Sequence, residues 1–372
     1  MMNSSESKES RIIGVQLCKA RELLQMTPRE VAHEINVTPQ EVVAWEKEES
    51  RPNLTQLEEM AELYGREIDY FLRQTQTPPE NIEFRGKTGQ SLKDLSKEAR
   101  IVLVRLDELC RTALEFESLL NRRPPVKLPH FKETDPPKTV AQDMRREFGL
   151  KDEPIPDLKN RLEDEGVRIF ELPVPEDAFS GFSFWHAEYG PCILLNATEK
   201  PKGRRNFTLA HELAHLVYTH GSSLCYIPIK LGESHPGLEY IANQVAIELL
   251  LPELGVVGDF RKRNLSRTPS EKDLAPIAYK KWGVSIQAFG YRLENVGLIE
   301  KGHINSLFET EPPFRRLKKG PRPPRFEREL GKRLVETSFE AYQKGLISIG
   351  KLAHGLDITI RDALKEIEKR SK

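Results

Sequence analysis

Cysteine is scarce in this chain of 372 residues. The four cysteines stand far apart, and no two of them form a C-x-x-C pair. This spacing argues against a disulfide framework and indicates free thiols in a reducing compartment. The cysteines are Cys18, Cys110, Cys192 and Cys225.

A net charge, a secretory signal and a membrane span are missing as well. Lysine and arginine together number 57, and so do aspartate and glutamate. The whole chain therefore resembles neither a general polyanion binder nor a protein of the membrane surface. The amino terminus is polar, and no apolar run approaches the length of a membrane span. We expect a cytoplasmic protein without a membrane partner, and the length allows two or three domains.

Residues 211–215 read His-Glu-Leu-Ala-His. Residues four apart lie on the same face of a helix, so His211 and His215 can direct two imidazole nitrogens at one metal ion. Glu212 lies beside that face, where its carboxylate can reach a water on the metal. The motif arises by chance in on the order of a few per cent of chains of this length, so its context matters.

A second helix, predicted for residues 238–251, supplies that context. Glu239 offers a third ligand, and Asn243 lies one turn later on the same face. There the asparagine can hydrogen-bond a ligand histidine and fix its tautomer. Two histidines, one carboxylate and an open position are the donor set of a catalytic zinc rather than a structural one. The alternative is a pair of solvated histidines and a surface glutamate.

These two stretches resemble the ImmA/IrrE family of metallopeptidases. The resemblance rests on Phe207-Thr-Leu-Ala-His-Glu-Leu-Ala-His215 and on Glu239-x-x-Ala-Asn-x-x-Ala-x-x-Leu-Leu-Leu-Pro252, with Val245 and Leu251 as apolar departures. It implies that His211, His215 and Glu239 bind zinc and that Glu212 is the catalytic base.

Other polar residues near the motifs are less well defined by the sequence. His186 and His220 are expected to be surface residues rather than ligands. The sequence does not choose a transition-state donor among four candidates, which are Tyr218, Tyr226, His235 and Tyr240.

Short amphipathic helices fill residues 11–75. Two of them, at 28–34 and 39–47, each begin at a threonine cap and are separated by a tight turn, which predicts a helix-turn-helix. Residues 44–61 resemble the XRE family of DNA-binding domains, and this resemblance implies that the start of the third helix faces the major groove. Gln40 is the best base reader, because its amide can pair bidentately with adenine. The residues expected at the DNA are Thr38, Gln40, Glu41, Ala44 and Lys47.

Charge is distributed unevenly along the chain. Residues 1–75 carry nine lysines and arginines against fourteen acidic residues, a net charge of −5. DNA binding should therefore be weak unless the protein dimerises. Sequence-specific DNA binding is favoured over a protein-interaction or dimerisation role. Residues 311–372 carry a net charge of +7. This segment either contacts DNA phosphates, binds the acidic domain of a partner subunit in a homodimer, or is a solvated linker.

We expect an α+β fold that is predominantly α. Residues 11–75 form a helix-turn-helix bundle, and residues 76–138 a linker with one long helix at 97–121. The apolar side of that helix is a dimer seam, a packing face within its own domain, or a spine between domains. Residues 139–300 form a zincin-like peptidase domain, and residues 301–372 a basic linker and C-terminal helices.

The peptidase domain is expected to hold a small sheet before the metal-site helix. A strand is predicted at 167–172, and a hairpin joins 182–186 to 192–196. An edge strand of such a sheet can hold a substrate backbone by β-augmentation.

The sequence as a whole predicts a zinc-dependent endopeptidase fused to a DNA-binding domain. The family resemblance implies that it cleaves a regulatory protein, such as a repressor or a partner encoded beside it, in transcriptional or stress control. The alternative is a transcription regulator or antitoxin whose peptidase-like domain senses a ligand or a partner, for example a toxin, and cuts nothing. The intact Glu212 favours the enzyme, because a sensor has no need of a base.

Overall fold

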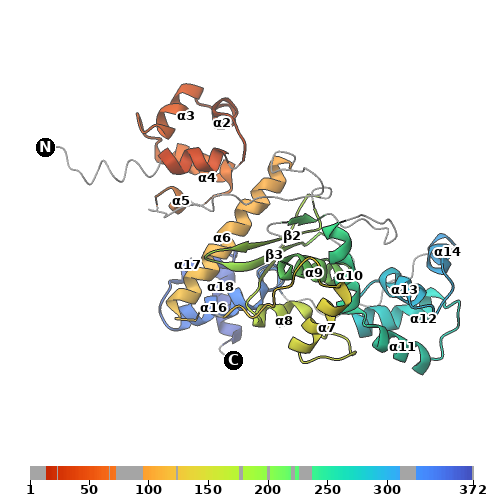
Figure 1. Ribbon diagram of the computed structural model, residues 1–372. Helices are drawn as coiled ribbons and strands as arrows, with labels where there is room; N and C mark the ends of the chain where they lie inside the picture. The colour runs from red at the N-terminus through yellow and green to blue at the C-terminus, as the bar shows by residue number, and fades with distance from the viewer. Residues whose placement is uncertain are drawn as a thin grey trace. The chain divides into compact units, whose positions relative to one another are not determined.

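The computed structural model (Figure 1) describes most of the chain and divides it into two compact units. The first comprises Met1–Ile82 and Gln90–Arg111, and the second Glu83–Gly89 and Thr112–Lys372. Helix α6, Lys97–Leu119, contributes residues to both units. The described residues are 14–22, 24–66, 68–72, 95–122, 125–175, 179–198, 202–218, 223–225, 237–310 and 324–370.

The first unit is a bundle of short helices whose starts are set by capping residues. Thr27 and Glu30 form a capping box at the first of the two motif helices, and Thr38 and Glu41 form another at the second. Asn36 takes a φ of 52° in the turn between them, a conformation that asparagine tolerates. The predicted helix-turn-helix is therefore present. The helices are α2 (Pro28–Glu34), α3 (Pro39–Glu46), α4 (Leu54–Tyr64) and α5 (Ile68–Leu72).

The second unit contains a small sheet and many helices, so the chain has the predicted α+β, predominantly α fold. The strands are β1 (Arg168–Leu172), β2 (Gly181–His186), β3 (Gly190–Asn196) and β4 (Ser223–Cys225). The helices before and around the sheet are α7 (Pro137–Glu147), α8 (Leu158–Asp164), α9 (Lys202–Val217) and α10 (Leu238–Leu250). The remaining ones are α11 (Glu253–Lys262), α12 (Glu271–Ala275), a π-helix (Pro276–Trp282), α13 (Ile286–Asn295), α14 (His303–Thr310), α15 (Arg325–Glu329), α16 (Gly331–Gln343), α17 (Ile349–Gly355) and α18 (Ile360–Arg370).

The sheet is mixed, with the strand order β1-β3-β2-β4. β3 runs parallel to β1 and antiparallel to β2, so the predicted hairpin is present. β4 was not predicted. It pairs with β2 from Gly181↔Cys225 to Ser183↔Ser223 and so occupies the outer edge of the first half of β2.

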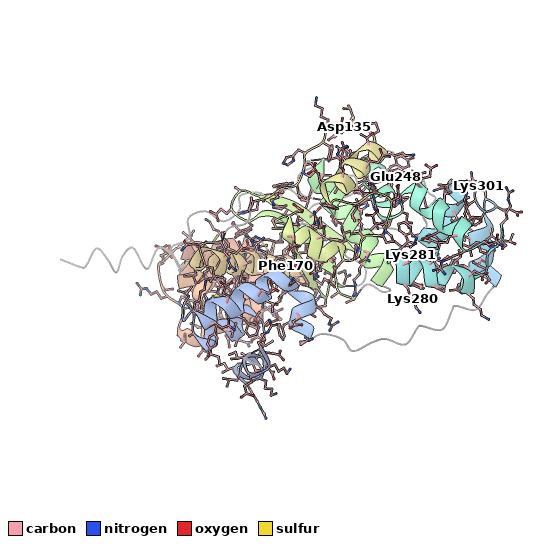
Figure 2. All side chains as sticks on the ribbon, turned by 90° about the horizontal axis from the view of Figure 1, so that it is seen from below. Asp135, Phe170, Glu248, Lys280, Lys281 and Lys301 are labelled. Atoms are coloured by element: carbon pink, nitrogen blue, oxygen red, sulfur yellow. The ribbon has the colours of Figure 1, made fainter. Side chains whose placement is uncertain are left out.

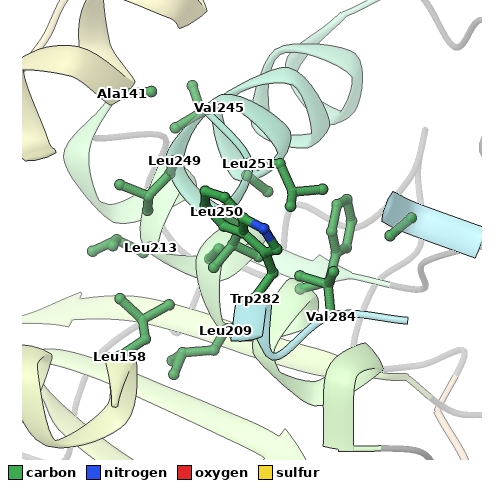
Figure 3. Packing of buried hydrophobic residues seen from close by; sticks show 14 of the residues in the cluster. Ala141, Leu158, Leu209, Leu213, Val245, Leu249, Leu250, Leu251, Trp282 and Val284 are labelled. Atoms are coloured by element: carbon green, nitrogen blue, oxygen red, sulfur yellow. The ribbon is translucent and has the colours of Figure 1, made fainter. Parts of the chain in front are cut away.

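The core of the second unit surrounds helices α9 and α10. α9 packs against β2 and β3, while α10 packs against α9 and α7 (Figure 1). Leu209 and Leu213 of α9 are buried in one cluster with Val245 and Leu249 of α10, and Figure 3 shows Leu213 near Leu249. This burial fixes the relative rotation of the two helices that carry the metal-site motifs.

Two buried arginines hold the carboxyl end of α10. Arg145 donates to the carbonyl of Leu249 and to two carbonyls of the loop that follows α7. Arg292 donates to the carbonyl of Leu251 and pairs bidentately with Glu248, which is labelled in Figure 2. These bonds satisfy carbonyls that a helix end leaves without partners inside the helix.

The structure corrects several details of the sequence interpretation. The stretch before residue 138 is no simple linker, because Leu128 lies in the core and the Phe131 amide donates to Val217 at the end of α9. Helix α12 is followed directly by the π-helix, which begins at Pro276, a residue that has no N–H to donate. Of the alternatives for the apolar side of α6, the structure agrees with a packing face within the chain, because most of that side is buried, although Leu119 is 39% exposed.

In the described part of the chain, no single helix is long and apolar enough to cross a membrane. α10 and α11, bent by 46° at the break between them, pass that test only as a pair and only on length and composition. Among the cysteines in that part, Cys18, Cys110 and Cys192 carry free thiols.

Glu117 of α6 joins three elements of the second unit through a buried ion network. Its two carboxylate oxygens accept hydrogen bonds of 2.7 Å from Arg168 of β1, and Nε of Arg333 in α16 lies 2.9 Å away. Glu117→Ala is expected to lower the free energy of unfolding by about 3–5 kcal/mol, because it leaves buried guanidinium groups without a counter-charge.

Glu115 is the matched control for this prediction. It lies on the same helix, but its side chain is 40% exposed and pairs with Lys351 at 3.0 Å. Glu115→Ala should change the free energy of unfolding by less than about 1 kcal/mol. Urea unfolding of both variants measures the difference, and equal losses would contradict the special role of Glu117.

Candidate metal centre

The two histidines of the H-E-x-x-H motif lie one helical turn apart on α9. Their Nε2 atoms are separated by 3.1 Å, and both side chains are almost fully buried. The surrounding apolar residues make α9 a core helix, so the imidazoles face neighbouring elements rather than solvent. The sequence prediction that His211 and His215 point at one position agrees with this geometry.

Helix α10 brings a carboxylate to the same position. Oε2 of Glu239 lies 3.2 Å from Nε2 of His211, and Oε1 lies 3.5 Å from Nε2 of His215. Ligand atoms about 2.0–2.2 Å from a tetrahedral zinc are about 3.3–3.6 Å from one another. The three separations lie close to that value, so the donor set fits a zinc ion. Each of the three residues offers one ligand atom, all within 4.8 Å of one another.

Asn243 lies one turn after Glu239 and supports the histidine pair. Its Oδ1 is 2.9 Å from Nδ1 of His211. An amide oxygen can only accept, so Nδ1 carries the proton and the lone pair is left on Nε2, which faces Glu239. This is the contact that the sequence predicts for Asn243, and it fixes the orientation of the His211 ring.

The electrostatic surroundings of the site are acidic. Burial lowers the pKa of His211, but the hydrogen bond and charge of Glu239, together with the charge of Glu212, outweigh it, so that the pKa is raised above its usual value. The same two carboxylates would attract a divalent cation. Because a metal ligand must be deprotonated, protons and a metal ion would compete for this site.

Glu212 occupies a different face of α9, as its place next to His211 in the helix requires. Its side chain is fully buried, and its Oε2 accepts a 2.7 Å hydrogen bond from the hydroxyl of Ser183 on β2. On the same face, Trp185 of β2 donates from Nε1 to the carbonyl of Leu216 at 2.9 Å. The histidines thus face α10, while Glu212 faces the sheet.

Sequence reasoning missed two residues beside Glu212, namely Ser183 and Gly181. A Cβ added to Gly181 would lie 2.5 Å from Oε1 of Glu212, so only glycine leaves room for the carboxylate. A signal existed in the sequence. In β2, small residues alternate with Phe182 and Phe184, which indicates that one face of the strand is closely approached by another element.

The remaining histidine and tyrosine candidates divide into three groups. His186 is the last residue of β2, where its Nδ1 accepts from two backbone amides that follow the strand and its ring stacks on Tyr189. The Tyr218 hydroxyl donates to the carbonyl of Asp135 at 2.9 Å, and Tyr240 is 48% exposed. Three further candidates, His220, Tyr226 and His235, lie outside the described residues.

The five residues that were expected at the DNA differ in their contacts and in their exposure to solvent. The side chains of Thr38 and Glu41 are engaged with each other in the capping box at the start of α3. Gln40 and Lys47 are exposed, and Ala44 is half-buried. A carboxylate held at the amino end of the helix also places a negative charge where phosphate would approach.

The contact between Asn243 and His211 leads to a prediction for metal affinity. Asn243→Ala should weaken zinc binding by about 10- to 100-fold, because it removes the acceptor that orients the ring. Gln244→Ala, one residue along α10, is the control and should leave the affinity unchanged. Competition with a chromophoric chelator measures both values, and equal affinities in the two variants would contradict the role of Asn243.

Comparison with known protein families identifies both units. Residues 162–294 match the IrrE N-terminal-like domain, which is a peptidase family, and residues 19–71 match a helix-turn-helix family. A search of curated proteins found no match. The chain thus joins an XRE-type helix-turn-helix domain to an IrrE N-terminal-like peptidase-family domain, which is the architecture of ImmA/IrrE proteins with a helix-turn-helix.

Proposed function

We propose that the chain is a zinc-dependent endopeptidase joined to a DNA-binding domain, and that it cleaves a regulatory protein in transcriptional or stress control. The observation that supports this most directly is the spacing of three ligand atoms. The closest atoms of His211, His215 and Glu239 are 3.1–3.5 Å apart. Two imidazoles and one carboxylate leave one position of a tetrahedral zinc open, as in catalytic sites.

The residues around this site have distinct roles in the proposed reaction. His211, His215 and Glu239 would hold the ion, and Asn243 would keep His211 in the ligating tautomer. A zinc ion there would polarise the scissile carbonyl and acidify water. Glu212 would accept a proton from the attacking water and deliver it to the leaving amine.

The helix-turn-helix domain supports the choice of substrate class. A DNA-bound peptidase shares its location with repressors and other regulators, and tethering raises the effective concentration of a neighbouring protein. Tethering to DNA therefore favours a repressor, or a partner that acts on the same DNA, over a general protein substrate.

A second function is favoured by the burial of the site. Glu212 and His211 are fully buried, and His215 is 1% exposed. Such a site suits a regulator or antitoxin whose peptidase-like domain binds a partner without cutting it. In that case the partner, a repressor or a toxin, would be bound and left intact.

The experiment that tests the proposal detects new amino termini. The zinc-loaded protein is incubated with a lysate of the source cells, and new amino termini are labelled and identified by mass spectrometry. We expect specific termini that disappear on chelation and return when zinc is added back. A partner that binds stably and yields no new terminus would support the second function instead.

The DNA-binding half of the proposal rests on the exposed residues of α3. We expect Gln40 to contact a base edge and Lys47 a phosphate, with Ala44 close to the groove. Selection from a pool of random DNA duplexes tests this part. An enriched sequence supports specific recognition, and the absence of any enrichment would favour a protein-interaction role for the domain.

A further inference from the structure

Helix α9 carries two functional faces, and only one of them belongs to the metal site. The stripe formed by Thr208, Glu212 and Leu216 faces β2, in register with alternate residues of that strand. A Cβ on Gly181 would touch Thr208 and Glu212, Ser183 bonds Glu212, and Trp185 bonds Leu216. The strand therefore contacts the helix at intervals of one turn, with Glu212 at the centre.

The hydroxyl group of Ser183 contacts the carboxylate of Glu212 directly. It is fully buried, and its backbone lies in an inner strand, paired with Ile193 on one side and Ser223 on the other. An ionised carboxylate can only accept, so the serine hydroxyl is the donor across the 2.7 Å contact. That distance lies in the range of charge-assisted O–H···O bonds.

Gly181 acts by leaving space. A Cβ added to Gly181 would lie 2.5 Å from Oε1 and 2.9 Å from Cγ of Glu212. Any larger residue at this position must therefore displace the Glu212 side chain. The third atom close to such a Cβ is Cγ2 of Thr208, at 2.8 Å, one turn before Glu212 on the same helix face. Gly181 thus leaves room for the Glu212 side chain, and the hydroxyl of Ser183 bonds the carboxylate.

We propose that Ser183 and Gly181 are positioning residues that hold the carboxylate of Glu212 in the orientation needed for proton transfer. This inference rests on the proposed peptidase function. Strand β2 would then have a role besides sheet pairing, because the face that carries Gly181 and Ser183 would set the orientation of Glu212, the proposed general base. A shift of one residue that brought Phe182 and Phe184 to the places of Gly181 and Ser183 would remove the site for the carboxylate.

The test uses a probe that does not depend on knowledge of the substrate. Acetohydroxamic acid chelates zinc through two oxygens and gives up a proton, which a correctly placed carboxylate takes. Its affinity for the zinc-loaded full chain therefore reports the position of Glu212, and isothermal titration calorimetry measures it. We expect Ser183→Ala and Gly181→Ala to weaken binding by about 10- to 100-fold, with zinc affinity unchanged.

A cysteine variant separates the hydrogen bond from packing. Ser183→Cys fills nearly the same space but donates weakly, so a positioning role predicts that it resembles Ser183→Ala. A purely structural role predicts that it resembles the wild type. Ser180→Ala, at a neighbouring buried serine, is the control and should leave the affinity unchanged. If Ser183→Ala does not fold, as judged by its melting temperature, the cysteine variant decides.

The outcomes distinguish this proposal from the proposed function. If Glu212→Gln weakens hydroxamate binding and both Ser183 variants bind as tightly as the wild type, the positioning role is overturned and the peptidase proposal stands. If the wild-type chain binds no zinc, or if Glu212→Gln leaves hydroxamate binding unchanged, the proposed function itself fails and the positioning role fails with it.

Discussion

Glu212→Gln is expected to lower kcat by about 100- to 10,000-fold while the protein keeps one equivalent of zinc. The substitution preserves the volume and shape of the side chain, and the glutamine oxygen can still accept the hydrogen bond from Ser183. The loss should therefore come from the missing base rather than from a changed core. KM should change little, because the substituted atom takes part only in proton transfer.

The measurement needs a substrate, which the analysis of new amino termini supplies. A peptide that spans the cleavage site is incubated with the wild type and with the variant, and zinc is quantified in both samples by mass spectrometry of the metal. Full cleavage by a zinc-loaded Glu212→Gln protein would remove Glu212 from the role of base. Lost cleavage together with lost zinc would indicate a disturbed site and would leave the base assignment without support.

The local part of the site could be predicted from sequence because helix geometry is regular. A spacing of four residues places His211 above His215, and the same spacing places Glu239 above Asn243. The contact between the two helices is different, because it depends on tertiary packing that spacing alone does not determine. Here the family resemblance supplied the pairing, and the structure brings the ligand atoms together.

The face of α9 that meets the sheet was not predicted, and the reason is physical. Whether Ser183 meets Glu212 depends on the register of β2 against the helix, which is set by the whole core. The strand β4 was missed for a related reason. Three residues are too short for a periodic pattern, and their pairing with β2 is a long-range contact.

Two of the residues that were expected at the DNA, Thr38 and Glu41, also cap helix α3. Thr38 and Glu41 were recognised as positions at the start of the recognition helix, and they do lie there. The same positions form the capping box, in which the two side chains bond each other. Gln40, between them, has no such task and is exposed.

Substitution of Glu239, the carboxylate among the three proposed ligands, should weaken zinc binding strongly. Sites with four protein ligands bind zinc with apparent free energies of about 10–16 kcal/mol, or roughly 2.5–4 kcal/mol for each ligand. Glu239→Ala should therefore weaken zinc binding by about a hundred- to a thousandfold. The side chain is 23% exposed, so its removal should affect the core far less than removal of either buried histidine.

Thermal unfolding gives an independent measure of the same loss. At a free zinc concentration of 100 times Kd, binding stabilises the folded state by about 2.7 kcal/mol, which corresponds to a rise in Tm of roughly 5–10 °C for a unit of this size. The wild type should show this rise, and Glu239→Ala should show none at the same zinc concentration. Tyr240→Ala, at the exposed neighbouring position, is the control and should respond to zinc like the wild type. A Glu239→Ala protein that still gains the full rise would exclude this carboxylate from the ligand set, because the two histidines alone cannot account for an unchanged affinity.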